Sequence, residues 1–251
     1  MIDNALLEWM ISYASVGPED VVLEVGAGLG FLTRLLAQRC RRVIAVEIDG
    51  RLMEVLMDEL RDMGNVELVQ GDVLKTPLPW FNKVVSTPPY SISSPLIFRL
   101  LDRVFDCAVL TFQEEFAKRL SAQVGSKDYS RLTVATYYRA DAELLDFVPK
   151  SAFYPPPDVD SVVVRMKPRA PPFRVKDEKT FFELVQIMFT QRNKKVRNAV
   201  LPFLLKRRIS KEKALKLADS LLFHEKRVRE LAPEDFGALT NEIAEKENLP
   251  P

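Results

Sequence analysis

Three closely spaced glycines form the first motif in this chain that could do chemistry. Gly26, Gly28 and Gly30 follow a short apolar run and precede a helical pattern, the context in which a glycine turn binds a nucleotide-like ligand. Glycine suits such a turn because it has no Cβ, so the backbone can approach a ligand closely. The dinucleotide fingerprint has two residues between its second and third glycines, and this motif has one. The spacing therefore favours a cofactor without a pyrophosphate, with a packing turn as the alternative.

Two acidic residues stand at the ends of the next two predicted strands. Glu47 ends the first of them and Asp72 follows the second. Ligands of open α/β sheets bind at the carboxyl ends of the strands. We therefore expect Glu47 to accept hydrogen bonds from ribose hydroxyls and Asp72 to accept one from an adenine amino group. Their neighbours Ile48 and Val73 should lie beside the same ligand.

The segment Thr87-Pro88-Pro89-Tyr90 follows a fourth predicted strand at the same sheet edge. The exocyclic nitrogen of adenine is a poor nucleophile because its lone pair is delocalised, and well-placed hydrogen-bond acceptors restore its reactivity. Rigid prolines can fix a backbone carbonyl as such an acceptor, and Tyr90 offers a stacking face for a flipped-out base. Together with the glycine turn, this segment indicates methyl transfer from S-adenosylmethionine to a base nitrogen. A proline turn with a packed tyrosine is the alternative.

Composition excludes several other kinds of site. His224 is the only histidine, which rules out a histidine metal site and a Ser-His-Asp triad. Cys40 and Cys107 are too few for a disulfide framework or a zinc site, so we expect no metal. The net charge of +1 leaves nucleic-acid binding to local patches. We find no apolar run of membrane-spanning length and no signal-peptide pattern at the start, so we expect a cytoplasmic protein.

Apolar periodicity predicts strands alternating with helices over the first half of the chain. Strands are expected at 21–25, 42–47, 66–70, 83–86 and 107–112, and helices at 4–14, 31–38, 51–63, from Ser94 onward, and at 113–122. This alternation predicts an α/β fold with a mostly parallel sheet covered on both faces. Two further strands, at 142–148 and 161–167, have no helix between them and should form an antiparallel edge.

The proline-rich segment 167–172 is the best candidate for a linker, because its prolines continue neither a helix nor a ladder. Beyond it the pattern is only helical, at 178–190, 196–205, 211–222 and 233–245. We therefore predict a catalytic domain over residues 1–168 and a small all-helical domain over residues 173–251.

The chain resembles the ribosomal RNA adenine N6-dimethyltransferases of the KsgA type. The glycine turn, the strand-end acids and the Pro-Pro-Tyr segment carry the likeness. Three further segments make it specific, and they extend it over nearly the whole chain: SKDYSRL at 126–132, SAFYPPPDVDS at 151–161 and QRNKKVRN at 191–198.

The resemblance implies a Rossmann-like catalytic domain that binds S-adenosylmethionine and a helical domain that binds RNA. The residues it assigns to cofactor binding are Glu24, Gly26, Gly28, Gly30, Glu47, Ile48, Asp72, Val73 and Thr87. It assigns the target base to Thr87, Pro88, Tyr90 and Phe153. The implied reaction is N6-(di)methylation of adjacent adenosines near the 3′ end of small-subunit ribosomal RNA, on the immature subunit. A monomer is our default expectation for an enzyme that docks on a ribosomal particle.

Two departures from the family pattern bear on activity. Thr87 stands where the family has Asn or Asp, and its hydroxyl reaches less far than an amide oxygen. We expect slower transfer, especially of the second methyl group. The family also has a Gly-Gln-(His or Asn)-Phe-Leu segment that closes over the cofactor, and Met1 aligns just after it. We expect either that this sequence starts downstream of that segment or that the closure is lacking.

A basic run supplies candidate RNA contacts. Residues 192–208 hold seven basic side chains and no acidic one, and basic surfaces bind the RNA backbone. We predict contacts from Arg192, Lys194, Lys195 and Arg197. A solvated helix face is the alternative for the run.

Other functions remain open for the whole chain. Large-subunit ribosomal RNA adenine methylases share the catalytic domain. Enzymes of the same fold that act on DNA adenine or protein glutamine have similar Pro-Pro-Tyr motifs, but the Phe153 segment and the helical tail argue against them. A non-enzymatic alternative is an RNA-binding assembly factor with weak or lost turnover. A nicotinamide oxidoreductase is disfavoured by the glycine spacing.

Overall fold

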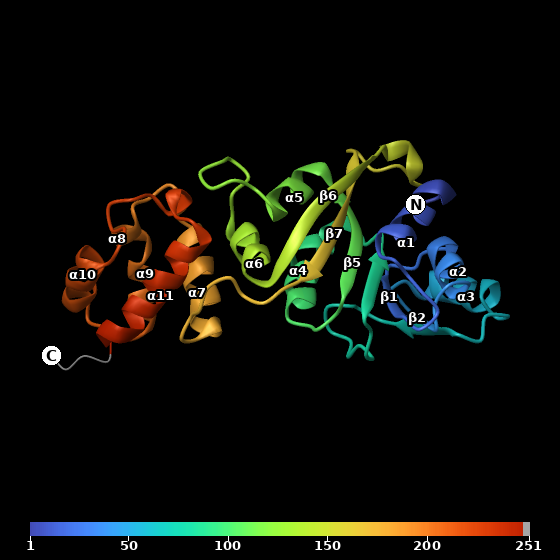
Figure 1. The fold of residues 1–251 in the computed structure, drawn as a ribbon, viewed down its shortest axis with the longest axis horizontal. Coiled ribbons are helices and arrows are strands. Elements are labelled where there is room, and N and C mark those ends of the chain that lie inside the picture. The colour runs from blue at the N-terminus through green and yellow to red at the C-terminus, as the bar shows by residue number, and fades with distance from the viewer. Residues whose placement is uncertain (248–251) are drawn as a thin grey trace. The chain divides into compact units, whose positions relative to one another are not determined.

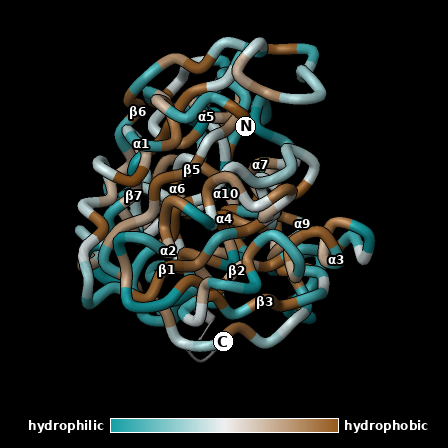
Figure 2. Tube along the Cα trace, turned by 90° about the vertical axis from the view of Figure 1, so that its right-hand side faces the viewer, coloured by the Kyte–Doolittle hydropathy of each residue, from teal (hydrophilic) through white to brown (hydrophobic). Residues whose placement is uncertain are grey.

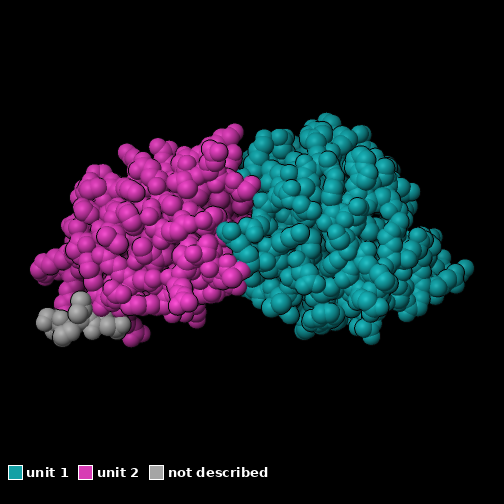
Figure 3. Space-filling view, in the orientation of Figure 1, with its two compact units in different colours: residues 1–118, 140–169 teal, residues 119–139, 170–251 magenta. Residues whose placement is uncertain are grey.

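The computed structural model describes residues 1–247, which fall into two compact units (Figure 3). Unit 1 comprises residues 1–118 and 140–169, and unit 2 comprises residues 119–139 together with the chain from residue 170 onward. The chain passes between the units three times, and the third crossing, at residue 170, lies within the proline-rich segment predicted as a linker. The sequence analysis assigned residues 119–139 to the catalytic domain, whereas in the structure they belong to the helical unit. Tyr129 and Tyr138 are buried in that unit's core, which explains the difference.

Unit 1 is built on a seven-stranded sheet in the order β3-β2-β1-β4-β5-β7-β6. Its strands are β1 (Val21–Val25), β2 (Arg42–Glu47), β3 (Val66–Gln70), β4 (Lys83–Ser86), β5 (Cys107–Gln113), β6 (Ala140–Val148) and β7 (Ser161–Pro168). Strands β1 to β5 pair in parallel, whereas β7 pairs antiparallel with both β5 and β6. The predicted parallel sheet with one antiparallel edge is confirmed.

The helices of unit 1 alternate with these strands in the chain (Figure 1). They are α1 (Asn4–Tyr13), α2 (Phe31–Ala37), α3 (Gly50–Glu59), α4 (Ser93–Leu101), α5 (Glu114–Leu120) and the short 3₁₀ turns η1 (Tyr90–Ile92) and η2 (Lys150–Ala152). Apolar side chains of α1, α2 and α3 share one core cluster with the sheet. Every residue of β1 is buried, as expected for a central strand covered on both faces.

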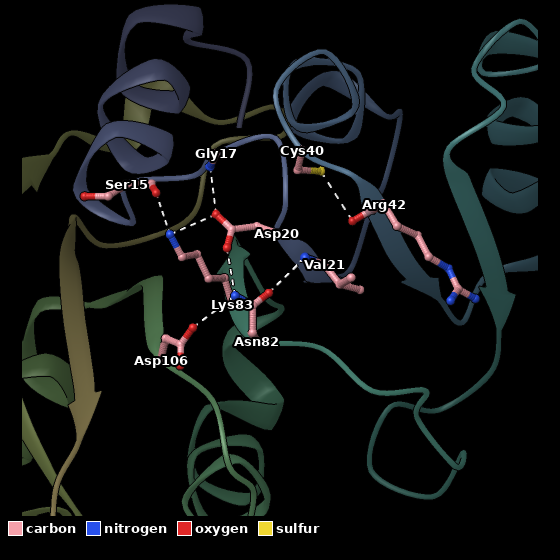
Figure 4. Close-up of polar contacts among 9 residues, drawn as sticks. All are labelled: Ser15, Gly17, Asp20, Val21, Cys40, Arg42, Asn82, Lys83 and Asp106. Atoms are coloured by element: carbon pink, nitrogen blue, oxygen red, sulfur yellow. Dashed lines mark hydrogen bonds and ion pairs between the residues drawn. The ribbon is translucent and has the colours of Figure 1, made fainter.

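A buried polar cluster fixes the amino end of β1 against that of β4 (Figure 4). The Lys83 ammonium lies 2.9 Å from the Asp20 carboxylate, and both side chains are about nine-tenths buried. Asn82 accepts from the Val21 amide at 2.8 Å and donates to Asp20 at 2.7 Å. Buried charges persist when they are paired and hydrogen-bonded, so this cluster sets which residues of the two strands lie side by side.

Unit 2 is helical. Its elements are α6 (Arg131–Arg139), α7 (Glu178–Phe189), α8 (Val196–Ala199), α9 (Leu201–Lys206), α10 (Lys211–Ser220), η3 (Val228–Glu230) and α11 (Pro233–Glu247). The single helix expected over 196–205 is two helices, and Pro202 lies in the first turn of the second one. Helix α6 was not predicted. Six of its nine residues are buried, so the sequence lacks the polar face that marks a surface helix.

Hydropathy alternates along the chain trace, with brown and teal stretches following one another (Figure 2). Within residues 1–247, no helix is both long enough and apolar enough to span a membrane.

Glu24 is an acid inside the sheet core. It lies in β1 and is 2% exposed. Its Oε2 has no hydrogen-bond partner among the described residues. Burial raises the pKa of Glu24 to about 8 from a usual value of 4.5, so the side chain is held as the neutral acid near pH 7.

The pH dependence of unfolding should report this proton. A raised pKa in the folded state adds stability that is complete below pH 4.5 and is gone above about pH 8. Glu24→Gln removes the titration. Between these limits, wild type should lose up to about 1.4 kcal/mol of unfolding free energy per pH unit relative to Glu24→Gln. Denaturant unfolding of both proteins at pH 5, 6.5 and 8 measures the difference. A difference that stays constant with pH would contradict a protonated Glu24.

Candidate cofactor and base site

The glycine turn has the backbone that its sequence predicts. Gly26, Gly28 and Gly30 have φ angles of 75°, 59° and 82°, a left-handed region that other residues adopt only at a cost. The turn begins where β1 ends, at Val25, and it leads into α2 at Phe31. Its conformation therefore depends on glycine at all three positions.

Gly26 also meets the Pro-Pro-Tyr segment. A Cβ at Gly26 would lie 3.0 Å from Cδ of Pro89, closer than side chains normally pack. The two segments follow β1 and β4, which are neighbours in the sheet. The absence of a side chain at Gly26 therefore lets the glycine turn and the base segment touch.

Glu47 ends β2 and connects the turn to that strand. Its Oε2 accepts a hydrogen bond from the Gly28 amide at 2.9 Å. Its Oε1 accepts from the amides of Ile48 and Asp49 at 2.8 and 3.0 Å. The carboxylate is 6% exposed. Since a carboxylate has about four acceptor positions, these three bonds still leave capacity for a ligand hydroxyl.

A cavity of about 210 Å³ lies at the carboxyl edge of β1, β2 and β3. Five of the predicted cofactor residues line it: Gly26, Glu47, Ile48, Asp72 and Val73. Residues Val25, Val46, Gly71, Pro89, Ser91 and Ile92 complete the wall and were not predicted. The aliphatic members come from strand ends and from the turn after Pro89, so a search for polar motifs passes over them.

The remaining predicted cofactor residues do not line this cavity. Gly28 and Gly30 shape the turn beside it, and Glu24 lies in the buried part of β1. Thr87 follows β4 and is half-buried. Asp72 is in the cavity wall, but its Oδ1 already accepts from the Leu74 amide at 2.9 Å.

The predicted base residues come from two segments: Thr87, Pro88 and Tyr90 follow β4, and Phe153 follows η2. The rings of Tyr90 and Phe153 meet edge to face, with centroids 6.3 Å apart and planes at 71°. Pro88 is buried, and Tyr90 is half-buried. Burial raises the pKa of Tyr90, so its hydroxyl stays protonated at neutral pH. Tyr90 therefore offers a ring face and a neutral hydroxyl, and no phenolate base.

Together, these parts can hold a nucleoside-like ligand beside a flat base. Strand-end carboxylates and an aliphatic wall face the cavity. The Tyr90 ring follows the next strand, β4, and meets the Phe153 ring. Because the two turns touch at Gly26 and Pro89, the two ligands would be neighbours. This arrangement suits a group transfer that depends on positioning.

In unit 2, the basic run meets acidic partners that are distant in sequence. Lys195 pairs with Glu225. Arg197 lies 2.7 Å from Glu225 and 3.9 Å from Asp219. Lys194 is exposed and forms no ion pair within residues 1–247. Of the four predicted RNA contacts, Lys194 is the most available.

Arg192 is committed to its own unit. Its guanidinium donates to the backbone carbonyls of Ser126 and Lys127, both at 2.8 Å. Its own carbonyl accepts from the Arg229 amide at 3.0 Å. Arg192 thus joins the two motif segments at 126–132 and 191–198. It also brings Lys127 and Arg229 to the turn that carries Lys194.

Comparison with known proteins shows the family of the chain. A family model described as ribosomal RNA adenine dimethylase matches residues 1–245. A Methanosarcina barkeri protein described as a probable ribosomal RNA small subunit methyltransferase A is 46% identical over 245 residues, covering 97% of this chain and 85% of the relative.

Solved structures of related methyltransferases are also similar to this chain. A dimethyladenosine transferase from Plasmodium falciparum matches with a TM-score of 0.84 and 32% identity, covering 98% of this chain and 97% of the other. The 23S rRNA methyltransferase ErmE matches with a TM-score of 0.69 and 30% identity, covering 96% and 98%. The chain therefore belongs to the ribosomal RNA adenine dimethylase family and is an S-adenosylmethionine-dependent methyltransferase.

Proposed function

We propose that this enzyme transfers methyl groups to N6 of adjacent adenosines near the 3′ end of small-subunit ribosomal RNA. We further propose that it acts as a monomer, in the cytoplasm, on the immature subunit. The observation that carries the proposal is the contact between the glycine turn and the Pro-Pro-Tyr segment. That contact makes one continuous site of the cofactor cavity and the aromatic pair.

The cavity fits the adenosine part of S-adenosylmethionine. Its wall combines aliphatic side chains, which suit a base, with Glu47 and Asp72, whose carboxylates suit ribose hydroxyls and an amino group. Gly26 lines its edge, and Pro89 packs where a side chain at Gly26 would lie. S-adenosylmethionine supplies an electrophilic methyl group on its sulfonium.

On the base side, the chain provides acceptors and a stacking surface. Pro88 is buried in a turn held by two prolines, so its carbonyl has a fixed direction. The Thr87 hydroxyl has no hydrogen-bond partner within residues 1–247 and is available as a second acceptor. These two oxygens would accept hydrogen bonds from the adenine amino group, which makes its lone pair available for attack on the methyl group. Tyr90 and Phe153 would enclose the ring.

A transfer assay tests the activity directly. Purified enzyme with radiolabelled S-adenosylmethionine should label small-subunit RNA, and nucleoside mass spectrometry should find methylated adenosine near its 3′ end. Large-subunit RNA in a parallel reaction is the control, because ErmE is a 23S rRNA methyltransferase. Labelling confined to large-subunit RNA would contradict the proposed substrate. Tight RNA binding without labelling would contradict turnover.

Thr87 should limit the second methylation. The Thr87→Asn variant carries a longer acceptor at this position, and we expect about tenfold faster dimethylation, the effect of one well-formed hydrogen bond. Wild type should accumulate monomethyladenosine, and the variant should convert it. The isosteric Thr87→Val control loses the hydroxyl and should be slower than wild type. Rapid and complete dimethylation by wild type in a time course would contradict this limit.

We infer that RNA phosphates bind a basic surface in unit 2 formed by Lys127, Lys194 and Arg229. None of the three side chains forms an ion pair within residues 1–247. Arg192 connects their three segments through hydrogen bonds of 2.8 to 3.0 Å. In this proposal Arg192 positions the surface, while Lys195 and Arg197 are partly neutralised by Glu225.

Charge reversal should separate these roles. Lys127→Glu and Lys194→Glu should each weaken RNA binding about tenfold. Each should also reduce the slope of log affinity against log salt concentration by about one, the effect of losing one phosphate contact. Lys179→Glu is the matched control, since Lys179 is exposed near the opposite end of α7 from this surface. Fluorescence anisotropy at several salt concentrations measures both quantities. Equal losses in all three variants would point to a general charge effect and contradict a defined surface.

A further inference from the structure

Within residues 1–247, the hydroxyl of Tyr90 has one hydrogen-bond partner, and that partner was not among the predicted site residues. The Oη of Tyr90 lies 2.5 Å from Oγ of Ser161, at the short end of the range for hydroxyl pairs. Ser161 has no exposed surface. It is the last residue of the family-like segment 151–161, and no chemical role was expected for it.

Ser161 occupies a rigid position. It is the first residue of β7, and it pairs with Gln113 of β5 on one side and with Val148 of β6 on the other. The residue before it is fixed as well, because the Asp160 carbonyl accepts from the Glu114 amide at 3.2 Å. A side chain on this backbone has little freedom to move.

The residue before Ser161 closes the loop that carries Phe153. The Asp160 carboxylate accepts from the Lys150 amide at 2.9 Å, which joins the two ends of the loop. Phe153 lies three residues after Lys150 and packs against the unit 1 core. Ser161 therefore links the support of Phe153 to the ring of Tyr90.

We propose that Ser161 is a positioning residue for base methylation, holding the Tyr90 ring at a fixed angle to Phe153 through its hydroxyl. The inference rests on the proposed function of the Tyr90 and Phe153 pair. With its hydroxyl occupied by Ser161, Tyr90 acts through its ring face. Hydrogen-bond recognition of the amino group is left to the segment before it, at Thr87 and Pro88.

A double-mutant cycle tests this link. Ser161→Ala and Tyr90→Phe each remove one hydroxyl, and each should lower kcat about tenfold, because loss of one hydrogen bond loosens the ring that orients the base. The affinity for S-adenosylmethionine, measured by calorimetry, should stay within about twofold. The double variant should be no slower than either single variant, since both changes break the same contact.

Thr111→Ala is the matched control. Thr111 is a fully buried hydroxyl residue on the adjacent strand β5, and it contacts the sulfur of Met10 instead of the aromatic pair. It should lose thermal stability without losing kcat. If Ser161→Ala does not fold, Ser161→Cys replaces it and should show a partial loss. A kcat within twofold of wild type, or losses that multiply in the double variant, would overturn the proposal.

A second measurement does not depend on turnover. NMR spectra of the full chain with ¹³C-labelled tyrosine rings contain six tyrosines, and Tyr90→Phe identifies the signal of Tyr90. Ser161→Ala should shift that signal and speed up its ring flips, and Thr111→Ala should not. An unmoved signal would overturn the proposal even in an active enzyme. If wild type transfers no methyl group, the proposed function fails separately from the structural link.

Discussion

The close approach of Gly26 to Pro89 is the constraint on which the site depends. A single added carbon at Gly26 would lie 3.0 Å from the proline ring. The two residues follow β1 and β4, and the strand order shows why they meet there. From β1 the chain proceeds outward through β2 and β3, then returns to β4 on the other side of β1. Ligands of open α/β sheets bind at such a reversal.

The carboxylate of Glu47 makes that reversal rigid. Its bonds to the amides of Gly28, Ile48 and Asp49 join the glycine turn to the end of β2. The Glu47 carboxylate thus shapes the cavity, in addition to its proposed role in binding a ligand there. The buried cluster of Asp20, Asn82 and Lys83 has a corresponding effect at the opposite ends of the strands. Polar groups thus fix β1 to β4 at their amino ends and the turn after β1 to the end of β2, and aliphatic residues fill the core.

Unit 2 uses its most family-like residues for internal contacts. Tyr129 is buried, and its hydroxyl donates to the Leu231 carbonyl at 2.7 Å. Arg192 joins the preceding loop to the turn at 191–194. A motif that marks a family is therefore not always a motif that touches the ligand. Here these two residues hold together the surface that we propose binds RNA, and their neighbours Lys127 and Lys194 are exposed.

The sequence by itself determined the sheet, its antiparallel edge and the glycine turn, because strand periodicity and glycine chemistry are local properties. It also determined the residue types at the strand ends, and with them the class of cofactor and base. Only the tertiary structure decided the partners of these groups. Glu225 neutralises Lys195 across 30 residues, and Ser161 meets Tyr90 across 71. Helix α6 was missed because its neighbours bury most of its surface. Contacts between distant segments depend on how the chain packs, and local pattern does not encode that.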